Sequence, residues 1–101
     1  MGLPYAMLGR MPSNAAAPQD PFERALLAVI RDAMTDRDVI PAELARRTGV
    51  SESQVSNLFN GKRTLRFGQF VAICKALGVP ASIMTARAEG REHEFGGGDS
   101  E

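Results

Sequence analysis

Apolar positions along the chain recur at helical spacing, and no stretch alternates in the way that a strand does. The first apolar group falls at i, i+4, i+7, i+8 and i+11, and its members are Phe22, Leu26, Val29, Ile30 and Ala33. This spacing places them on one side of a helix. We expect the helix to begin at Asp20-Pro21 and to end near Thr35, because aspartate caps a first turn and proline fits its first position.

Two further helices, at 41–48 and 51–59, each carry sequence signals at both ends. Proline at its first position opens the earlier helix, and Gly49 suits the left-handed residue that ends it. A capping box of Ser51 and Gln54 opens the later helix, and an Asn-Gly turn dipeptide ends it. The apolar residues expected to pack inward here are Leu44, Ala45, Val50, Val55, Leu58 and Phe59.

The connection between these two helices is about three residues long and begins with Gly49. So short a connection cannot bring the helices antiparallel, and it forces a crossing at a large angle, as in the helix-turn-helix. Ala45 is small where the helices would approach most closely, and Val55 and Leu58 would supply the apolar contacts. A plain helical hairpin is the alternative interpretation.

Two more helices complete a predicted five-helix domain over 21–88. The fourth covers about 66–77, and its inward side is expected to carry Phe67, Phe70, Val71, Cys74 and Leu77. Gly78 ends it, and Pro80 begins the fifth helix, which would keep Ile83 and Met84 inward and fray near its end. The predicted fold is therefore all-α and compact, flanked by flexible termini.

Both ends of the chain lack a periodic apolar pattern. Residues 1–20 are punctuated by proline and glycine and are expected to form a flexible N-terminal arm. Residues 89–101 combine a glycine run with five acidic side chains and are expected to form a disordered acidic tail.

The charge of the chain is balanced overall but not along its length. The 101 residues contain 12 Lys and Arg and 12 Asp and Glu. Between residues 46 and 75, however, there are six basic residues, and Glu52 is the sole acidic one. A basic stretch of this kind indicates a polyanionic partner, although a solvated surface with chance clustering is the alternative.

The cellular compartment is predicted from what the sequence lacks. Cys74 is the single cysteine, so no intrachain disulfide is possible and a reducing compartment is indicated. No apolar run approaches the roughly 20 residues that cross a bilayer, and the first residues have no basic region typical of a secretory signal. We therefore expect a cytoplasmic protein with no membrane partner.

The segments PAELARRTGVSESQVSNLFNGKR and FVAICKALGVP resemble the Cro/C1-type (XRE-like) helix-turn-helix family of bacterial and phage transcription regulators. The resemblance covers about residues 22–87 and implies a compact five-helix domain like that of lambda repressor. Members of this family usually bind a palindromic DNA operator as dimers and place the second motif helix in the major groove. The resemblance thus implies double-stranded DNA as the partner and a homodimer as the binding form.

Four polar residues would face outward from 51–59 if its apolar residues face the core: Glu52, Ser53, Ser56 and Asn57. Asparagine can bond adenine bidentately, serine can bond either base type, and glutamate can accept from cytosine. By resemblance Glu52, Ser53 and Asn57 match the family's base-reading positions, and Ser56 is expected to contribute. The alternatives are an ordinary polar surface and, for Glu52, a favourable interaction with the helix dipole.

A polar and basic segment follows this helix and is predicted to bind DNA phosphates. Its members are Asn60, Lys62, Arg63 and Arg66. Arg46 and Arg47, late in 41–48, are candidates for the same role. For each basic residue the alternative is a solvated side chain.

No catalytic group, metal site or cofactor is predicted. Cys74 falls on the apolar side of 66–77, where a core thiol is expected. His93 is the single histidine, and no ligand set surrounds it in the sequence.

Two functions remain open from the sequence. The first is a sequence-specific, repressor-like transcription regulator, which the basic segment after Asn60 favours. The second is an antitoxin or other protein-interaction module that binds a partner through its termini, which Phe95 and the apolar residues of the arm, Tyr5, Met7 and Leu8, favour. If a dimer forms, the fifth helix with Ile83 and Met84 is the expected interface.

Overall fold

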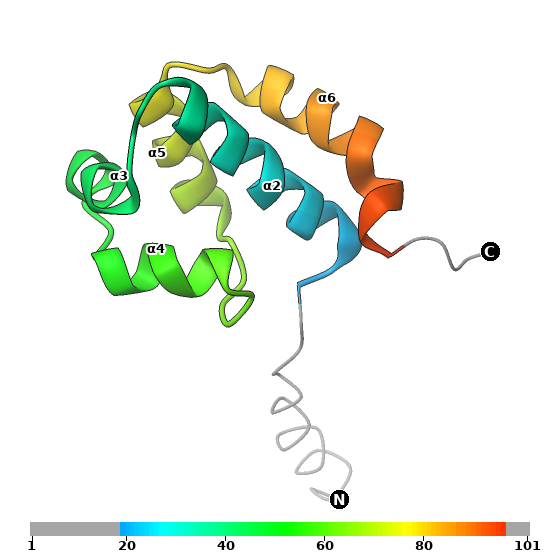
Figure 1. The fold of residues 1–101 in the computed structure, drawn as a ribbon, viewed down its shortest axis with the longest axis horizontal. Helices are drawn as coiled ribbons and strands as arrows, with labels where there is room; N and C mark the ends of the chain where they lie inside the picture. The colour runs from blue at the N-terminus through cyan, green and yellow to red at the C-terminus, as the bar shows by residue number, and fades with distance from the viewer. Residues whose placement is uncertain (1–18, 97–101) are drawn as a thin grey trace, which may run out of the picture.

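The structure, a computed structural model, describes residues 19–96, and this range contains helices but no strand. The helices are α2 (Pro21–Asp36), α3 (Pro41–Thr48), α4 (Glu52–Phe59), α5 (Phe67–Leu77), α6 (Ala81–Arg91) and the short 3₁₀ helix η1 (Glu92–Phe95). Figure 1 shows α2 running through the middle of the molecule, with α6 alongside it and α3, α4 and α5 gathered at its C-terminal half. The predicted all-α fold of five α-helices is confirmed.

The long helix α2 supplies one wall of the core. Its N-cap is Asp20, whose carboxylate accepts a 2.8 Å hydrogen bond from the Glu23 amide, and proline opens its first turn. The predicted apolar stripe is inward, and the buried residues of this helix are Ala25, Leu26, Leu27, Val29, Ile30, Ala33 and Met34. α2 packs chiefly on α6 and η1, while α3 packs on α4 and α5.

The corner between α3 and α4 is a helix-turn-helix. Gly49 ends α3 in the left-handed conformation (φ 80°, ψ 5°), and its amide donates to the Ala45 carbonyl at 2.9 Å. Ser51 then caps α4 by accepting a 3.2 Å hydrogen bond from the Gln54 amide. In Figure 1, α3 is seen nearly end-on whereas α4 lies across the view, so the two helices cross at a large angle. Val55 and Leu58, each 1% exposed, fix α4 to the core.

Two apolar residues predicted to lie inward are exposed. Phe67 is 80% exposed, because it occupies the first turn of α5 at the rim of the core, and Phe70 is the first residue of that helix to be buried. Ile83 is 41% exposed, because Met84 and Ala88 occupy the inward side of α6, and the adjacent position points away from it.

The folded part of the chain extends beyond the expected domain, 21–88, at both ends. Gln19, assigned to the arm, is 7% exposed and belongs to the folded part, whereas Asp20 caps α2 as expected. Residues 89–96, assigned to a disordered tail, form the end of α6 and η1. The arm up to residue 18 and the tail from residue 97 lie outside the described range.

Four contacts explain why the chain stays folded to residue 96. The side chain of Phe95 packs against the core, and the Arg91 guanidinium lies over its ring at 5.9 Å from the centroid. Arg91 also pairs with Asp32 of α2 at 2.9 Å and with Glu94 at 3.2 Å. The hydrogen bond to Glu94, with the charges of Glu94 and Asp32, raises the pKa of Arg91.

Over residues 19–96, a single helix long and apolar enough to cross a membrane does not occur. The stretches Phe67–Leu77 and Ala81–Phe95 meet that criterion only in combination, and they are bent by 108° relative to each other.

Candidate nucleic-acid interface

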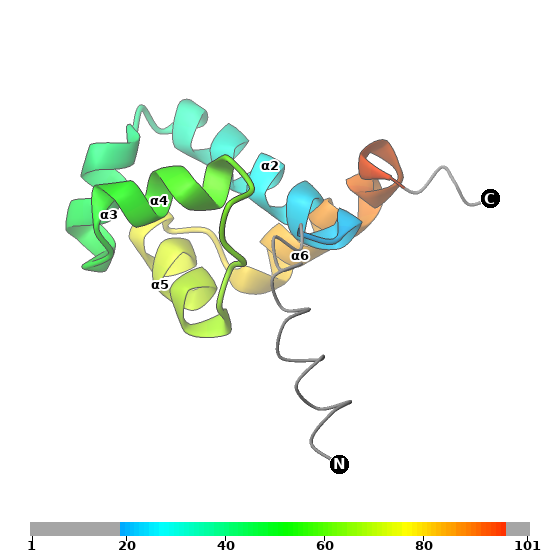
Figure 2. The ribbon, with the colours of Figure 1, turned by 90° about the horizontal axis from the view of Figure 1, so that it is seen from below.

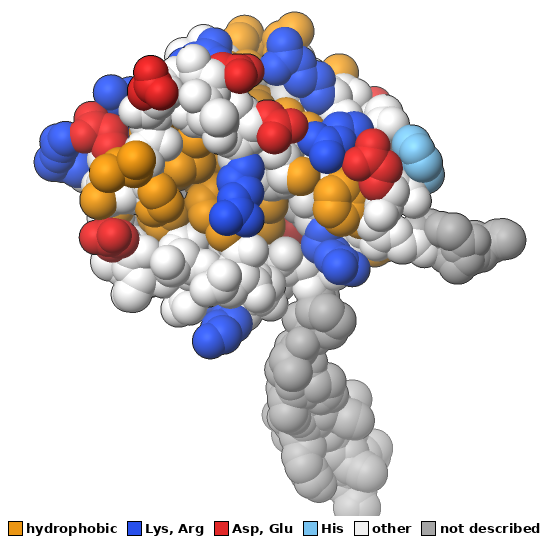
Figure 3. Space-filling model, in the orientation of Figure 1, with side chains coloured by type: hydrophobic (Ala, Val, Ile, Leu, Met, Phe, Trp, Pro, Cys, Tyr) orange, Lys and Arg blue, Asp and Glu red, His pale blue; other side chains and the backbone are white. Residues whose placement is uncertain are grey.

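One side of α4 is exposed and polar. Opposite the buried Val55 and Leu58, the side chains of Glu52, Ser53 and Ser56 are exposed. In Figure 2, α4 lies towards the viewer, and none of the other helices covers its outer side. In Figure 3 the lower edge of the molecule, where α4 lies, is mostly white, with few charged or hydrophobic side chains. The predicted outward residues therefore share one accessible surface.

Asn57 lies at the flank of this surface and is half-buried. Within residues 19–96 its amide side chain forms no hydrogen bond, and the same holds for the side chains of Glu52 and Ser56. The Ser53 hydroxyl lies 3.4 Å from that of Ser51. The donors and acceptors of α4 are thus directed to a partner or to water.

The turn after α4 folds back over the end of the helix. The Asn60 amide donates to the Ser56 carbonyl at 2.9 Å, and the Lys62 amide donates to the Asn57 carbonyl at 2.9 Å. Gly61 makes the reversal possible with φ of 78°. This geometry brings the basic segment directly beside the C-terminal end of the exposed side of α4.

The four predicted phosphate ligands of this turn lie close together in the chain but differ in exposure. Asn60, Lys62 and Arg66 are exposed, whereas Arg63 is half-buried and its Nε lacks a hydrogen-bond partner among the described residues. Arg63, Thr64 and Arg66 line a shallow depression. Three cationic side chains therefore flank the end of α4, and none of them forms an ion pair within residues 19–96.

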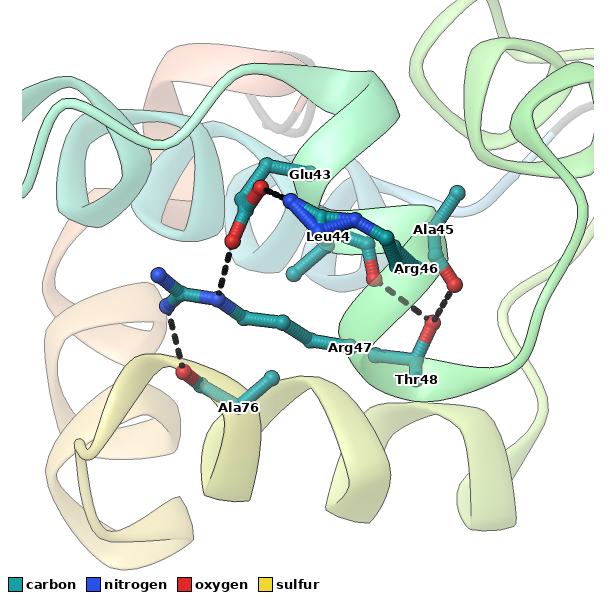
Figure 4. A network of polar contacts seen from close by, with 7 residues as sticks. All are labelled: Glu43, Leu44, Ala45, Arg46, Arg47, Thr48 and Ala76. Carbon is teal, nitrogen blue, oxygen red and sulfur yellow. Dashed lines mark hydrogen bonds and ion pairs between the residues drawn. The ribbon is translucent and has the colours of Figure 1, made fainter.

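The two other basic candidates lie at the opposite end of α4, where α3 ends. Glu43 accepts from both, forming an ion pair with Arg46 and a 2.8 Å hydrogen bond with the Arg47 Nε. The Arg47 Nη1 also donates to the Ala76 carbonyl in α5 at 3.2 Å (Figure 4). The structure thus separates Arg46 and Arg47 from the basic turn and gives Arg47 contacts within the fold.

The sequence did not predict the residues near the start of α2 that hold the turn after α4 in place. The buried Gln19 side chain donates to the Leu58 and Arg63 carbonyls, and the Glu23 carboxylate accepts from the Leu65 amide. Gln19 precedes the contacted residues by 39 and 44 positions, so no local pattern marks it. It also missed Arg31, whose guanidinium lies 5.2 Å from the centroid of the Phe59 ring at the end of α4.

Within the described range, neither the cysteine nor the acidic side chains form a second candidate site. Cys74 is buried, and desolvation raises the pKa of its thiol, so the reactive thiolate is disfavoured. Among residues 19–96, groups of three or more His, Cys, Asp or Glu side chains that could hold a metal ion do not occur.

Comparison with known proteins identifies one protein family that matches this chain and one gene regulator of similar structure. The family model for the Cro/C1-type HTH DNA-binding domain matches residues 29–82, which include α3, α4 and α5 in full. Two crystal structures of the clp gene regulator ClgR from Corynebacterium glutamicum are similar to this chain. No match to this sequence was found among curated proteins.

The two structural matches agree with each other. One is 29% identical with a TM-score of 0.63, and the match covers 68% of this chain and 90% of the ClgR chain. The other is 27% identical with a TM-score of 0.67, and it covers 72% of this chain and 78% of the ClgR chain.

Proposed function

Because this chain belongs to the Cro/C1-type helix-turn-helix family of DNA-binding domains, we propose that it is a transcription regulator that reads duplex DNA with α4. The observation that carries this function is the exposed polar side of α4 with a basic turn at its end. A helix of this kind fits the major groove, which is about 12 Å wide. The similarity to the gene regulator ClgR supports the same conclusion.

The base-reading set is proposed to be Glu52, Ser53, Ser56 and Asn57. Asn57 carries the most weight, because a free amide can donate to and accept from adenine at once, whereas serine hydroxyls discriminate weakly. Glu52 stands at the first position of α4, where its charge also favours the helix N-terminus. Its specific use would be as an acceptor for the cytosine amino group.

The phosphate-binding set is proposed to be Asn60, Lys62, Arg63 and Arg66. Contacts with the phosphates on one side of the groove would fix the register of α4 without carrying sequence information. Exposure supports Lys62 and Arg66 most directly. Arg46, at 68% side-chain exposure, is kept as a secondary candidate, whereas the contacts of Arg47 within the fold make it a weaker one.

A homodimer on a palindromic operator is proposed on geometric grounds. One eight-residue α4 reaches few base pairs, and two-fold binding of half-sites about 34 Å apart doubles the sequence that is read. Met84 of the expected interface is fully buried, so Ile83 is the apolar residue of α6 that remains available. Repression would follow if the operator overlaps a promoter, and such a regulator would act in the cytoplasm.

Of the two sequence features that favoured a protein-interaction module, one no longer favours it. Phe95 packs against the core and so does not offer a free apolar side chain in a polar tail. Tyr5, Met7 and Leu8 of the arm lie outside the described residues. DNA binding is therefore the function that we propose for the domain.

The direct test is selection of a duplex from a random DNA pool by the full chain, followed by fluorescence anisotropy at two salt concentrations. We expect an enriched motif with two-fold symmetry and binding that weakens as the salt concentration rises. Failure to enrich any motif, together with equal weak binding to all duplexes, would reject a sequence-specific regulator.

A further inference from the structure

The basic segment after α4 is held in place by side chains and not by its own backbone hydrogen bonds. The hydrogen bonds between backbone groups that form the turn end at the Lys62 amide, and the next one is accepted by the carbonyl of Arg66, the N-cap of α5. In the described structure, the backbone of residues 63–65 forms no such hydrogen bond. A segment that lacks backbone pairing is expected to open easily unless side chains hold it.

Two side chains at the start of α2 hold this segment. The Gln19 Nε2 donates to the Leu58 carbonyl at 2.9 Å and to the Arg63 carbonyl at 2.7 Å, and a single amide nitrogen has the two protons that this requires. The Glu23 carboxylate accepts from the Leu65 amide. Both ends of residues 63–65 are thereby fixed from the side of α2, while the side chains of Lys62 and Arg66 remain exposed.

Burial makes the Gln19 contact effective. Gln19 is 7% exposed and is the sole buried polar residue among the described residues. Removing its donors would leave the Leu58 carbonyl with the Gly61 amide alone, at 3.2 Å, and the Arg63 carbonyl without a partner among the described residues. A buried backbone group without a partner is costly, so the contact strongly favours one position of the segment.

We infer that Gln19 and Glu23 are positioning residues for DNA binding: they hold residues 62–66 so that their cations meet the phosphates together. This inference rests on the proposed function. A segment that is ordered before binding does not lose conformational freedom when DNA arrives, so part of the affinity would be set from the first turn of α2. Neither residue need touch DNA itself.

The test uses the full chain, a duplex selected by the unaltered protein from a random pool, and an unrelated duplex of equal length. Gln19→Met keeps the side-chain length but removes both donors, and Glu23→Met removes the acceptor. We expect each to weaken binding to both duplexes by about 5–10-fold and to lower the salt slope by about one, because phosphate contacts are lost equally on any sequence. The ratio of specific to unrelated binding should stay unchanged.

Two control variants separate positioning from general stability and charge. Asp20→Ala removes the α2 cap beside Gln19 but leaves the contacts to residues 58–65 in place. It should lower the midpoint of thermal unfolding while affinity and salt slope, measured well below that midpoint, remain those of the unaltered chain. Glu23→Gln keeps an acceptor oxygen and should preserve both the affinity and the exchange protection of the Leu65 amide, which Glu23→Met should lose.

Gln19→Met and Glu23→Met variants that are folded and keep the affinity and the salt slope of the unaltered chain would overturn the inference and leave the proposed function intact. Loss of affinity for the selected duplex alone would also overturn it, because that result assigns the effect to base reading. Absence of DNA binding by the unaltered chain would instead overturn the proposed function, and this inference with it.

Discussion

The guanidinium of Arg47 donates to the carbonyl of Ala76, 29 positions later, and so links the end of α3 to the last turn of α5. The same side chain is paired with Glu43, which holds the guanidinium in line with that carbonyl. Figure 4 shows this chain of contacts running from Glu43 through Arg47 to α5. The contact helps to fix the helix-turn-helix on the rest of the domain.

We expect Arg47→Ala to lower the free energy of unfolding by about 0.5–1 kcal/mol, because solvent screens a side chain that is 44% exposed. Arg46→Ala is the matched control, since Arg46 pairs with Glu43 alone, and it should cost less than about 0.5 kcal/mol. Urea denaturation of both variants measures the difference. Equal effects would mean that the Ala76 contact adds nothing to stability.

The corner glycine is required by its backbone conformation and not by crowding. A Cβ at Gly49 would meet no atom within 4 Å, but its φ is 80°. Gly49→Ala should therefore destabilise the domain by about 1–2 kcal/mol, the usual cost of the left-handed region for a residue with a Cβ. Thermal or urea unfolding measures this loss.

Gly90→Ala is the opposite control for the same measurement. Gly90 lies within α6, has no positive φ and also has open space where a Cβ would be. Alanine there should raise the free energy of unfolding by about 0.5–1 kcal/mol through its helix propensity. A loss of stability at Gly90 as large as that at Gly49 would contradict the conformational explanation.

Local signals explain why the sequence predicted most of the fold. Asp20, Ser51, Gly49 and Gly78 each mark a helix end through residues no more than a few positions away, and all four occupy the predicted caps. The polar side of α4 was predictable for the same reason, because its period follows from the buried Val55 and Leu58.

Long-range contacts explain what the sequence did not predict. The hydrogen bonds of Gln19 and the packing of Phe95 depend on partners that only the folded chain brings near, so both residues were assigned to the flexible ends. The contact of Arg47, a candidate for phosphate binding, with the Ala76 carbonyl was not predicted for a similar reason, since this acceptor lies in α5. Phe67 fits the apolar period of α5 but lies beyond the rim of the core, which periodicity alone cannot define.

Asn57→Ala should weaken binding to a selected duplex by about 1–3 kcal/mol, or roughly 5–150-fold, and relax preference at one base pair. The physical reason is the loss of a bidentate contact with one base. Binding to an unrelated duplex should change little, so anisotropy on both duplexes separates the two effects. Gln54→Ala, on the core-facing flank of α4, is the control and should preserve the preferred sequence.

If Asn57→Ala bound the selected duplex as tightly as the unaltered chain, Asn57 would have no base-reading role. An equal loss on both duplexes would indicate instead that Asn57 contacts phosphate.

Lys62→Ala and Arg66→Ala should each reduce the slope of log K against log salt by about one, because each removes one phosphate contact and its released counterion. Both side chains are exposed, so neither change should alter the free energy of unfolding by more than about 0.5 kcal/mol. Lys75→Ala is the matched control, since Lys75 is an exposed cation in the last turn of α5, remote in sequence from the basic turn. A slope change at Lys75 as large as at Lys62 would point to diffuse attraction rather than defined contacts.

Ile83→Asp should weaken the proposed homodimer without unfolding the domain. Ile83 is 41% exposed on α6, so a carboxylate there stays in water in the monomer but would be desolvated in an apolar interface.

Sedimentation velocity with the selected duplex should then show mainly one chain per DNA, and binding to the two-fold site should fall by at least tenfold. Ser82→Asp, an exposed neighbour on another side of α6, is the matched control and should leave the assembly unchanged. Met84→Ala is expected to act on the core of each chain and not on the interface. Because Met84 is fully buried, this change should lower the free energy of unfolding by about 2–5 kcal/mol. Two chains per duplex in Ile83→Asp, at the affinity of the unaltered protein, would exclude this side of α6 and direct the search for the interface to the exposed Phe67 on α5.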